Sequence, residues 1–336
     1  MKKLILTICL LLVEVYCIHA QQTGFPKLTG PYLGQKAPDK APELFADGII
    51  ANAQYNFHTN IVFSPVGDEA YWATYDNNGR NNRILESKLI RGVWTTPQIA
   101  SFSIYDQGDD APFLSPDGER LFFLSKRPIS NDAKSGKENI WFVERTSNGW
   151  SKPRPLPQAI NSMEGIHWQI SVDGKDNLYF SVCKDLYARA REGDVYCSRY
   201  IDGQYTEPIK LGNSINGKGY NCCPYIFPDG RTLLFVREEY DTHKIQIWIS
   251  FRKDDGSWTE ARKLSGYIGD QGQNCPICTP DGRFLFFLRY VNSFCQPFWI
   301  DAGFIEDLRP MARGLLRGTV RRAIQGGHAK RVPPTS

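Results

Sequence analysis

Five short polar segments carry the side chains of this 336-residue chain that are best suited to chemistry. Each segment lies just before a turn of the type Ser-Pro-Asp-Gly or a variant of it. In chain order they are His58-Thr59-Asn60, Asp109-Asp110-Ala111, Gly165-Ile166-His167, Asn221-Cys222-Cys223 and Gln273-Asn274-Cys275. Imidazole and carboxylate groups can bind a divalent metal ion or hydrogen-bond a sugar or a peptide. The alternative is that these segments are polar only because they begin strands at a solvent-filled opening, and that they have no chemical role.

The predicted ligand-binding residues come from these segments and their immediate neighbours. They are His58, Asp109, Asp110, His167, Trp168, Asn221 and Asn274. Trp168 differs from its counterparts because, counted from the turns, it takes the place that proline holds in three other copies. Its indole offers a flat apolar face to a sugar or a peptide.

Two kinds of catalysis use the same side chains. Hydrolysis of a glycan needs two or three carboxylates at a defined separation, and only Asp109 and Asp110 supply acids in these segments. A lyase would use a histidine as the base, and a divalent metal ion would stabilise the anion that develops. Because converging acids are not evident, the sequence favours binding without catalysis and without a cofactor. A glycan hydrolase and a metal-dependent lyase are the alternatives, with His58, Asp109, Asp110 and His167 as candidate catalytic residues.

The cysteines beyond residue 20 all lie in the last three copies of the turn pattern. They are Cys183, Cys197, Cys222, Cys223, Cys275, Cys278 and Cys295. An exported protein can form disulfides, and this odd number leaves at least one thiol unpaired. The expected pair joins Cys275 to Cys222 or Cys223, because their strands should be neighbours. Cys275 and Cys278 have the spacing of a zinc motif. Residues three apart on a strand point to opposite faces, however, so zinc is less favoured than a disulfide or buried thiols.

The turns that follow the polar segments recur along the chain. They occupy residues 64–67, 115–118, 171–174, 227–230 and 279–282. Their glycines, at positions 67, 118, 174, 230 and 282, are separated by 51, 56, 56 and 52 residues. Pro, Asp and Gly suit a tight turn between antiparallel strands. A period of this length indicates a repeat architecture.

Each copy continues with the same strands. An aromatic second strand follows every turn, at residues 70–73, 121–124, 178–181, 233–236 and 285–288, and its lack of polar alternation indicates burial on both faces. A third strand follows, and a fourth opens with Gly and an aromatic residue in all copies but the last. Residues 42–52 have the pattern of the missing fourth strand. The sequence thus predicts an all-β, five-bladed β-propeller of four-stranded antiparallel blades, closed by an N-terminal strand that completes the last blade. Six blades is the alternative, if the residues before position 41 supply further strands.

These repeats resemble a known family. The Ser-Pro-Asp-Gly hairpins, the Ile-Trp third strands, the Gly-Trp turns and the closing Phe-Ile-Glu-Asp-Leu at 304–308 resemble the WD-like β-propeller repeats of TolB-type exported bacterial proteins. The resemblance covers roughly residues 41–310. It departs from the pattern at Val66, in place of Asp, and at Val172, in place of Pro. For function the resemblance implies a periplasmic binding or scaffold domain, although propellers host many activities.

The two ends of the chain differ in composition from the repeats. Residues 1–20 have Lys2 and Lys3, an apolar run from Leu4 to Val13 and a cleavage point near Ala20, which is typical of a signal peptide. Residues 21–40 are a Gly/Pro-rich leader, and residues 311–336 are a basic tail that we expect to be disordered. The mature protein is therefore expected to be periplasmic or secreted. No later run approaches the roughly 18 apolar residues of a membrane-spanning helix.

Charge limits the partners that the sequence predicts. The chain has a formal net charge of +4, but the basic tail has no acidic residue, and the repeats themselves are slightly acidic. A body without a basic face argues against nucleic acid as the partner. The predicted role is a ligand- or protein-binding scaffold that holds a protein, a peptide or a glycan at the mouth of its central tunnel.

Overall fold

The computed structural model of the chain describes residues 25–51, 57–75, 82–104, 108–129, 136–183, 185, 192–270 and 272–310. The predicted signal peptide and the basic tail lie outside these residues, as do residues 21–24 of the predicted leader. None of the helices in the described ranges has the length and apolar character needed to cross a membrane.

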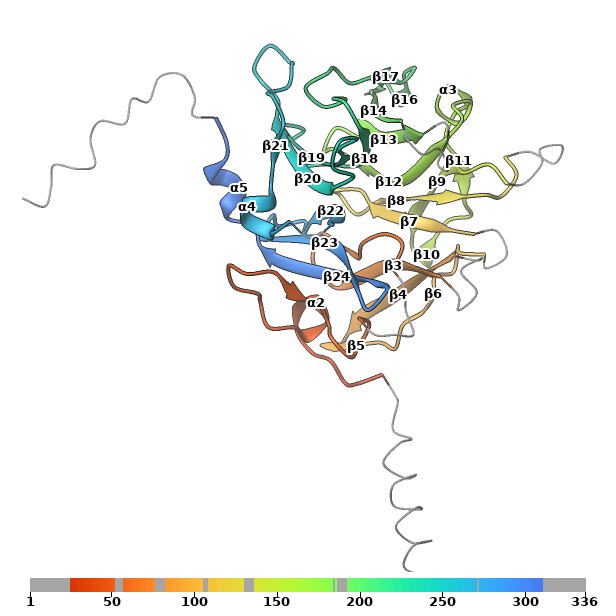
Figure 1. The fold of residues 1–336 in the computed structure, drawn as a ribbon. Helices are drawn as coiled ribbons and strands as arrows, with labels where there is room; N and C mark the ends of the chain where they lie inside the picture. The colour runs from red at the N-terminus through yellow and green to blue at the C-terminus, as the bar shows by residue number, and fades with distance from the viewer. Residues whose placement is uncertain are drawn as a thin grey trace, which may run out of the picture.

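Antiparallel β-sheets make up most of the described structure (Figure 1). The first copy of the repeat forms a sheet in the order β2-β3-β4-β5, with β6 also paired to β4: β2 (Val62–Phe63), β3 (Glu69–Tyr75), β4 (Asn82–Ile90), β5 (Val93–Trp94) and β6 (Gln98–Ile99). The second copy forms a sheet in the order β10-β9-β8-β7, with β11 also paired to β9: β7 (Asp110–Leu114), β8 (Arg120–Ser125), β9 (Asn139–Thr146), β10 (Gly149–Trp150) and β11 (Arg154–Pro155).

The third and fourth copies are joined into one sheet by a single parallel bridge between Gly193 and Tyr220. The third copy contributes β12 (Ile166–Val172), β13 (Leu178–Cys183), β14 (Gly193–Ser198) and β17 (Ile209–Lys210), and a separate hairpin of β15 (Tyr200–Ile201) and β16 (Gln204–Tyr205). The fourth copy contributes β18 (Tyr220–Ile226), β19 (Thr232–Glu238), β20 (Ile245–Phe251) and β21 (Arg262–Lys263). The helices are single turns: α2 (Pro31–Gly34), α3 (Gln158–Asn161), α4 (Ser265–Ile268) and α5 (Phe304–Asp307).

The last sheet combines strands from both ends of the described chain. Its order is β1-β24-β23-β22, with β1 (Glu43–Leu44), β22 (Asn274–Cys278), β23 (Phe284–Val291) and β24 (Phe294–Asp301). Glu43 lies opposite Trp299 in the ladder, and Phe45 extends the pairing by donating its backbone N–H to Pro297 O at 2.8 Å. The Phe45 ring is fully buried, with centroids 4.9 Å from Phe286 and 5.0 Å from Trp299. A short early segment therefore pairs with the strands at the end of the described chain.

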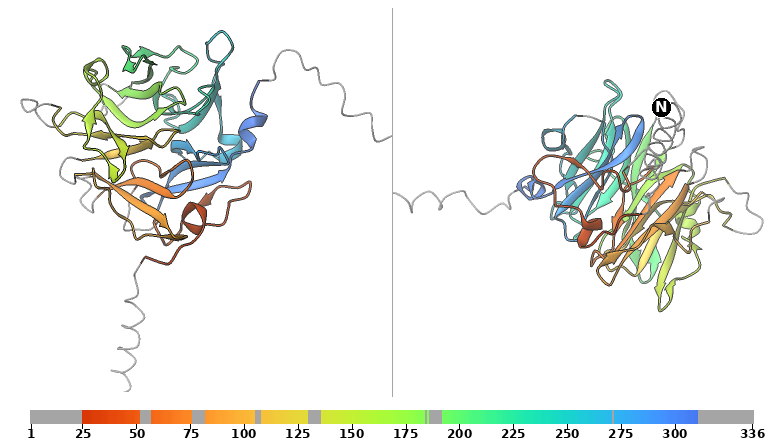
Figure 2. Two further views of the ribbon diagram at one scale, coloured as in Figure 1. Left: turned by 180° about the vertical axis from the view of Figure 1, so that it is seen from behind. Right: turned by 90° about the horizontal axis from the view of Figure 1, so that it is seen from below.

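The first strands of the copies, β2, β7, β12, β18 and β22, lie at the centre of the molecule. β7 contacts β2 and β12, and β18 contacts β12 and β22. Asn60, just before β2, donates its side-chain N–H to the backbone oxygen of Cys275 in β22 at 3.0 Å. Figures 1 and 2 show the sheets grouped around this common centre. This radial arrangement of antiparallel sheets is that of a β-propeller, so the prediction of an all-β propeller fold is confirmed at this level.

The second strands form the packed layer around the centre. Leu121 to Leu124 of β8 are all at most 1% exposed, so both faces of this strand are covered as its uninterrupted apolar run predicts. Trp72 of β3 is also fully buried, and Trp141 and Trp299 are buried on the neighbouring third strands β9 and β24. Dense packing of these strands holds the central strands, and the segments before them, in fixed positions.

The third turn differs from its sequence-based prediction. Ser171 and Val172 are paired strand residues of β12, and the hairpin turn begins at Asp173, whose N–H donates to Asn177 O at 3.1 Å. The turn glycines of the other four copies have φ between +66° and +77°, whereas in the third copy Asp176, and not Gly174, has positive φ. Placing the third turn at residues 171–174 was therefore wrong. Val172 keeps the backbone N–H that proline lacks, so it can remain in the strand.

Candidate functional site

The polar segments before the turns meet at one end of the central strands. His58 contacts the carboxylate of Asp110, and its ring stacks on Trp168 with centroids 4.9 Å apart and planes at 29°. Cys275 Sγ lies 3.7 Å from the backbone oxygen of His58 and 3.8 Å from Cys223 Sγ. The structure thus brings together four of the five segments and Trp168, the residue that directly follows the third.

Asp110 fixes the orientation of His58. The Asp110 side chain is buried and makes a close ion-pair contact with His58 Nδ1. Its Oδ2 also accepts a hydrogen bond from Asn82 Nδ2 at 2.7 Å, and its Oδ1 accepts the N–H of Ala111 at 2.7 Å. Three donors leave this carboxylate well satisfied, and His58, whose side chain is 12% exposed, is the member of the pair that reaches solvent.

Burial and charge act in opposite directions on the His58–Asp110 pair. Burial alone disfavours the charged imidazole, but the charge and hydrogen bond of Asp110 outweigh it, so the pKa of His58 is raised above 6.5. Burial likewise disfavours the charged carboxylate, and His58 outweighs it, so the pKa of Asp110 is lowered below 3.8. Both groups are therefore charged together over a wide range of pH.

Asp109 does not take part in this pair. It is fully buried, and both of its carboxylate oxygens accept hydrogen bonds from Arg127 Nη2, at 2.6 Å and 2.7 Å. Oδ2 also accepts the N–H of Ile104 at 2.6 Å. The structure therefore places Asp109 in a structural ion pair with Arg127, and the prediction that it joins His58 in one ligand set lacks support from this geometry.

Trp168 lies at a bulge that three other copies share. In the ladders, His167 lies opposite Ser181 as Asp110 lies opposite Leu124, so the next residue, Trp168, corresponds to Ala111. The residues at this position in four copies, Ala111, Trp168, Cys223 and Cys275, all have φ between +48° and +65°. The prediction that Trp168 takes the place of the prolines was therefore wrong by one residue, because Gln169 is the counterpart of Pro112. The side chain of His167 lies outside the described part of the structure, whereas its backbone is paired in β12.

Asn221 and Asn274 use their amides within the protein. Asn221 is fully buried, donates to the backbone oxygens of Gly193, Gly217 and Gly219, and accepts from Arg237 Nε at 2.8 Å. Asn274 is partly exposed, and its Oδ1 accepts from the N–H of Cys275 at 3.0 Å and from Cys223 Sγ at 3.4 Å. Asn221 is thus a structural residue, and Asn274 supports the cysteine cluster.

Three cysteines form a buried cluster beside His58. Cys223 Sγ lies 3.6 Å from Cys222 Sγ and 3.8 Å from Cys275 Sγ, and all described cysteines are thiols. Burial opposes ionisation of Cys223, but hydrogen bonds from Cys222 and Cys275 lower its pKa, whereas burial and the neighbouring Cys223 raise the pKa of Cys275. The predicted disulfide between Cys275 and Cys222 or Cys223 stays a prediction, and these sulfurs are neighbours as it requires.

Cys278, the second cysteine of the predicted zinc motif, is not part of this cluster. It is the last residue of β22, and burial raises the pKa of its thiol. In the described ranges, no group of three or more His, Cys, Asp or Glu side chains is arranged to hold a metal ion.

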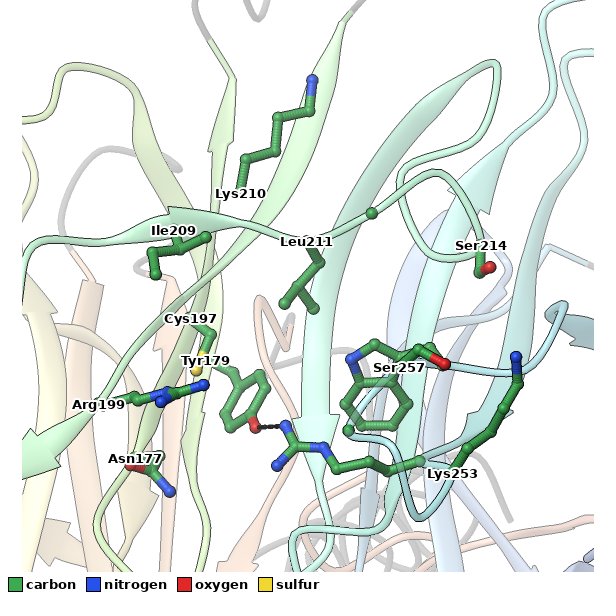
Figure 3. Close-up of a pocket in the computed structure, with 14 residues that line it drawn as sticks. Asn177, Tyr179, Cys197, Arg199, Ile209, Lys210, Leu211, Ser214, Lys253 and Ser257 are labelled. Atoms are coloured by element: carbon green, nitrogen blue, oxygen red, sulfur yellow. Dashed lines mark hydrogen bonds between the residues drawn. The ribbon is translucent and has the colours of Figure 1, made fainter.

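A pocket that sequence reasoning missed lies between the third and fourth copies. It has a volume of about 520 Å³ and is lined by residues of both copies, among them Asn177, Tyr179, Arg199 and Lys253 (Figure 3). Figure 3 shows Asn177, Tyr179 and Arg199 on one wall and Lys253 and Ser257 on the opposite wall. We call it the inter-repeat pocket. Another pocket, of about 140 Å³, lies on the axis and is lined mainly by apolar residues from the turn ends of the central strands.

Comparison with known proteins identifies fold relatives only. No family model matches the chain, and no curated protein matches it. Similar solved structures include an endo-arabinase from Bacteroides thetaiotaomicron VPI-5482 (14% identity, 75% of this chain and 96% of that chain, TM-score 0.49). They also include an α-L-arabinofuranosidase from Podospora anserina (13%, 82% and 96%, TM-score 0.44) and the β-propeller domain of the trilobed protease from Pyrococcus furiosus (13%, 73% and 68%, TM-score 0.39). At these identities and TM-scores the likeness carries no inference about activity.

Proposed function

We propose that this chain is an exported, TolB-like, five-bladed β-propeller that binds a protein, a peptide or a glycan at the end of its axis where His58 and Trp168 lie. The five copies of the turn and the pairing of β1 with β24 support the blade number and the closure. The apolar run and basic start of residues 1–20 support export to the periplasm or beyond the cell.

The observation that carries this proposal is the His58–Trp168 stack. A partly exposed imidazole is held in place by a buried carboxylate on one side and by an indole on the other. Such a fixed group offers a polar edge and an aromatic face together, which suits recognition of a sugar ring or a peptide. The side chains do not need to be ordered on binding, so little conformational entropy is lost.

The geometry favours binding over the glycan hydrolase alternative. That mechanism needs two carboxylates that can reach a substrate. Arg127 occupies both oxygens of Asp109, and Asp110 accepts from His58, Asn82 and Ala111. A metal-dependent lyase would need ligands in addition to His58, and the sequence offers Asp109, Asp110 and His167.

The test compares binding by variants of the two stacked residues. A panel of bacterial and plant oligosaccharides, together with a random peptide library, is screened against the full mature chain. We expect His58→Ala and Trp168→Ala to weaken binding of any hit at least tenfold, because they remove a central, well-packed contact. His243→Ala is the control, since its side chain is 67% exposed and contacts Glu238 instead. Equal affinity in the His58 and control variants would contradict the proposal. Release of shortened glycan, lost in Asp110→Asn, would favour the hydrolase.

A further inference from the structure

The inter-repeat pocket is lined by basic groups. Arg199, Lys210, Arg252 and Lys253 all contribute to its wall, and none of the described residues that line it is Asp or Glu. Lys210 is compensated by Asp194, with Nζ and Oδ2 2.6 Å apart. Glu260 accepts a hydrogen bond from Ser214 at 3.4 Å but is exposed and is not part of the lining. The side chains that line the pocket therefore carry an excess of positive charge, and the buried Asp173, which is not part of the lining, accepts a hydrogen bond from Asn177 Nδ2 at 2.9 Å.

The first and second copies contain the same arrangement with its charges balanced. Arg145 lies opposite Trp150 in the ladder, as Arg252 lies opposite Trp258, and each guanidinium stacks on the indole, at 4.0 Å and 4.8 Å. Between the first two copies, Arg145 donates to both oxygens of Glu69, at 3.0 Å and 2.6 Å. This paired geometry is the strongest form of carboxylate recognition by arginine.

The two acids of the balanced site are missing from the inter-repeat pocket. Tyr71 lies opposite Glu86 in the ladder, as Tyr179 lies opposite Cys197, so Cys197 takes the place of Glu86. Two positions before the tyrosine, Asn177 stands where the first copy has Glu69. The basic residue at the equivalent of Lys88 is retained as Arg199.

The groups that replace the acids carry no charge to offset the arginines. Burial raises the pKa of Tyr179, and burial also raises the pKa of Cys197, so both side chains are neutral near pH 7. Arg252 Nη2 donates to the hydroxyl of Tyr179 at 2.6 Å, a neutral acceptor, and Arg252 Nε is buried without a hydrogen-bond partner among the described residues. A buried donor of this kind is costly to leave unpaired.

We propose that the inter-repeat pocket binds a ligand through a carboxylate group, which takes the place that Glu69 fills between the first two copies. Arg252 would hold the carboxylate, and Arg199 and Lys253 would add charge at the rim. The volume of about 520 Å³ lies within the range of small-molecule sites and leaves room for a ring the size of a monosaccharide. This site lies between repeats and is separate from the His58–Trp168 stack, so either proposal can fail alone.

The experiment uses D-glucuronate as the carboxylate probe, D-glucose as its neutral counterpart and inorganic sulfate as a different anion. Saturation-transfer NMR on the full mature chain detects weak binding and gives apparent Kd values by titration. We expect binding of glucuronate but not of glucose, and only weak displacement by equimolar sulfate. Arg252→Gln should weaken glucuronate binding tenfold or more, because a charge-assisted pair of hydrogen bonds is lost. Arg199→Gln should weaken it severalfold.

Two further variants, together with Arg199→Gln, allow the proposal to be contradicted. Arg252→Lys retains the charge but not the planar fork, so binding should fall between the native protein and Arg252→Gln. Arg199 is exposed, so Arg199→Gln tests the pocket even if changes at Arg252 disturb folding. Arg231→Gln is the matched control, because Arg231 pairs with Asp254 outside the pocket lining and its loss should leave the Kd unchanged. Equal binding of glucose, equal displacement by sulfate, or an unchanged Kd in both Arg252→Gln and Arg199→Gln would overturn the proposal.

Discussion

His58 shows how a single side chain is held at the end of the axis. Its ring stacks on Trp168, Asp110 contacts its Nδ1, and its backbone oxygen lies against the thiol of Cys275. Residues from two other copies thus hold the imidazole, and a residue from a third contacts the backbone of His58. Since the pair with Asp110 is largely buried, its electrostatic contribution should be measurable as a dependence of stability on pH.

The His58–Asp110 pair predicts a stability maximum in mildly acidic solution. The raised pKa of His58 gives a contribution that is complete below pH 6.5 and is lost as pH rises through that raised pKa. The lowered pKa of Asp110 gives a contribution that is complete above pH 3.8 and is lost as pH falls through that lowered pKa. The free energy of unfolding in urea should therefore be larger near pH 5.5 than at pH 9. Besides Asp110, the charges that act on His58 come from Glu138 and Cys223.

Replacing Asp110 isolates this contribution. Asp110→Asn should lower the free energy of unfolding at pH 5.5 by about 3–5 kcal/mol, because it leaves a buried partner uncompensated. The difference between pH 5.5 and pH 9 should shrink in this variant and persist in the control His243→Asn. The same pH slope in the native protein and in Asp110→Asn would contradict the assignment.

At the scale of elements, the hairpin turns explain both a success and a failure of the sequence-based predictions. Four Ser-Pro-Asp-Gly-type turns have their glycine at positive φ, as the residue pattern predicts. In the third copy, three residues, Trp168 to Ile170, lie between the paired His167 and Ser171, where the second copy has only Ala111 and Pro112. This extra residue shifts the turn. Nothing in the local sequence indicates that Gly174, unlike the other turn glycines, lacks a positive φ.

Two turn glycines allow backbone strain to be separated from steric contact. Gly67 has φ +74° and open space where the methyl group of an alanine would lie, whereas Gly118 has φ +77° and Pro65 Cδ 3.1 Å from the corresponding position. Gly67→Ala should cost about 1–2 kcal/mol of unfolding free energy from the left-handed backbone alone. Gly118→Ala should cost more, because the ring of Pro65 must also move. Urea unfolding of both variants measures the difference, and Gly212→Ala, with open space and no positive φ, serves as the control. If both turn variants lose the same unfolding free energy, the ring of Pro65 moves aside without lowering stability.

At the scale of the whole molecule, β1 is the contact between the two ends of the repeat array. Phe45, just after β1, packs into the aromatic cluster of the last sheet and also lies 6.1 Å from Phe63 of the first. Residues before β1 add to this contact, because Trp94 Nε1 donates to Gly30 O at 2.7 Å and the Tyr32 ring packs against Phe63 and Phe284. The sequence predicted a strand within residues 42–52, because their pattern repeats that of the fourth strands, and the structure pairs Glu43 and Leu44 of this range with β24.

The packing of Phe45 between the first and last sheets predicts that its replacement strongly lowers the stability of the protein. Phe45→Ala should lower the free energy of unfolding by about 3–5 kcal/mol, because it opens a cavity among fixed aromatic rings. Glu43→Ala changes an exposed residue of β1 itself and should alter stability by about 0.5 kcal/mol or less. Urea unfolding followed by tryptophan fluorescence measures both. Comparable losses in the two variants would mean that Phe45 is not a structural link between the ends.

The whole molecule also shows why the inter-repeat pocket could not be predicted from the sequence. The repeat pattern draws attention to the segments before each turn, whereas the pocket is made by residues after the turns of two different copies. An alignment of the second strands would have set Glu69 against Asn177, a visible loss of charge. The meaning of that difference depends on Arg252, which belongs to the next copy and reaches the pocket only in the folded chain.

The pairing of β1 with β24 also has a consequence for how the protein reaches its native state. The nascent chain makes Glu43 early and Trp299 near the end of the repeats, so the first strand has no partner until nearly all of the protein has been synthesised. Such long-range pairing slows folding, because a large loop must close before the contact forms. The last sheet therefore cannot be completed on the ribosome until the segment that contains Trp299 has emerged.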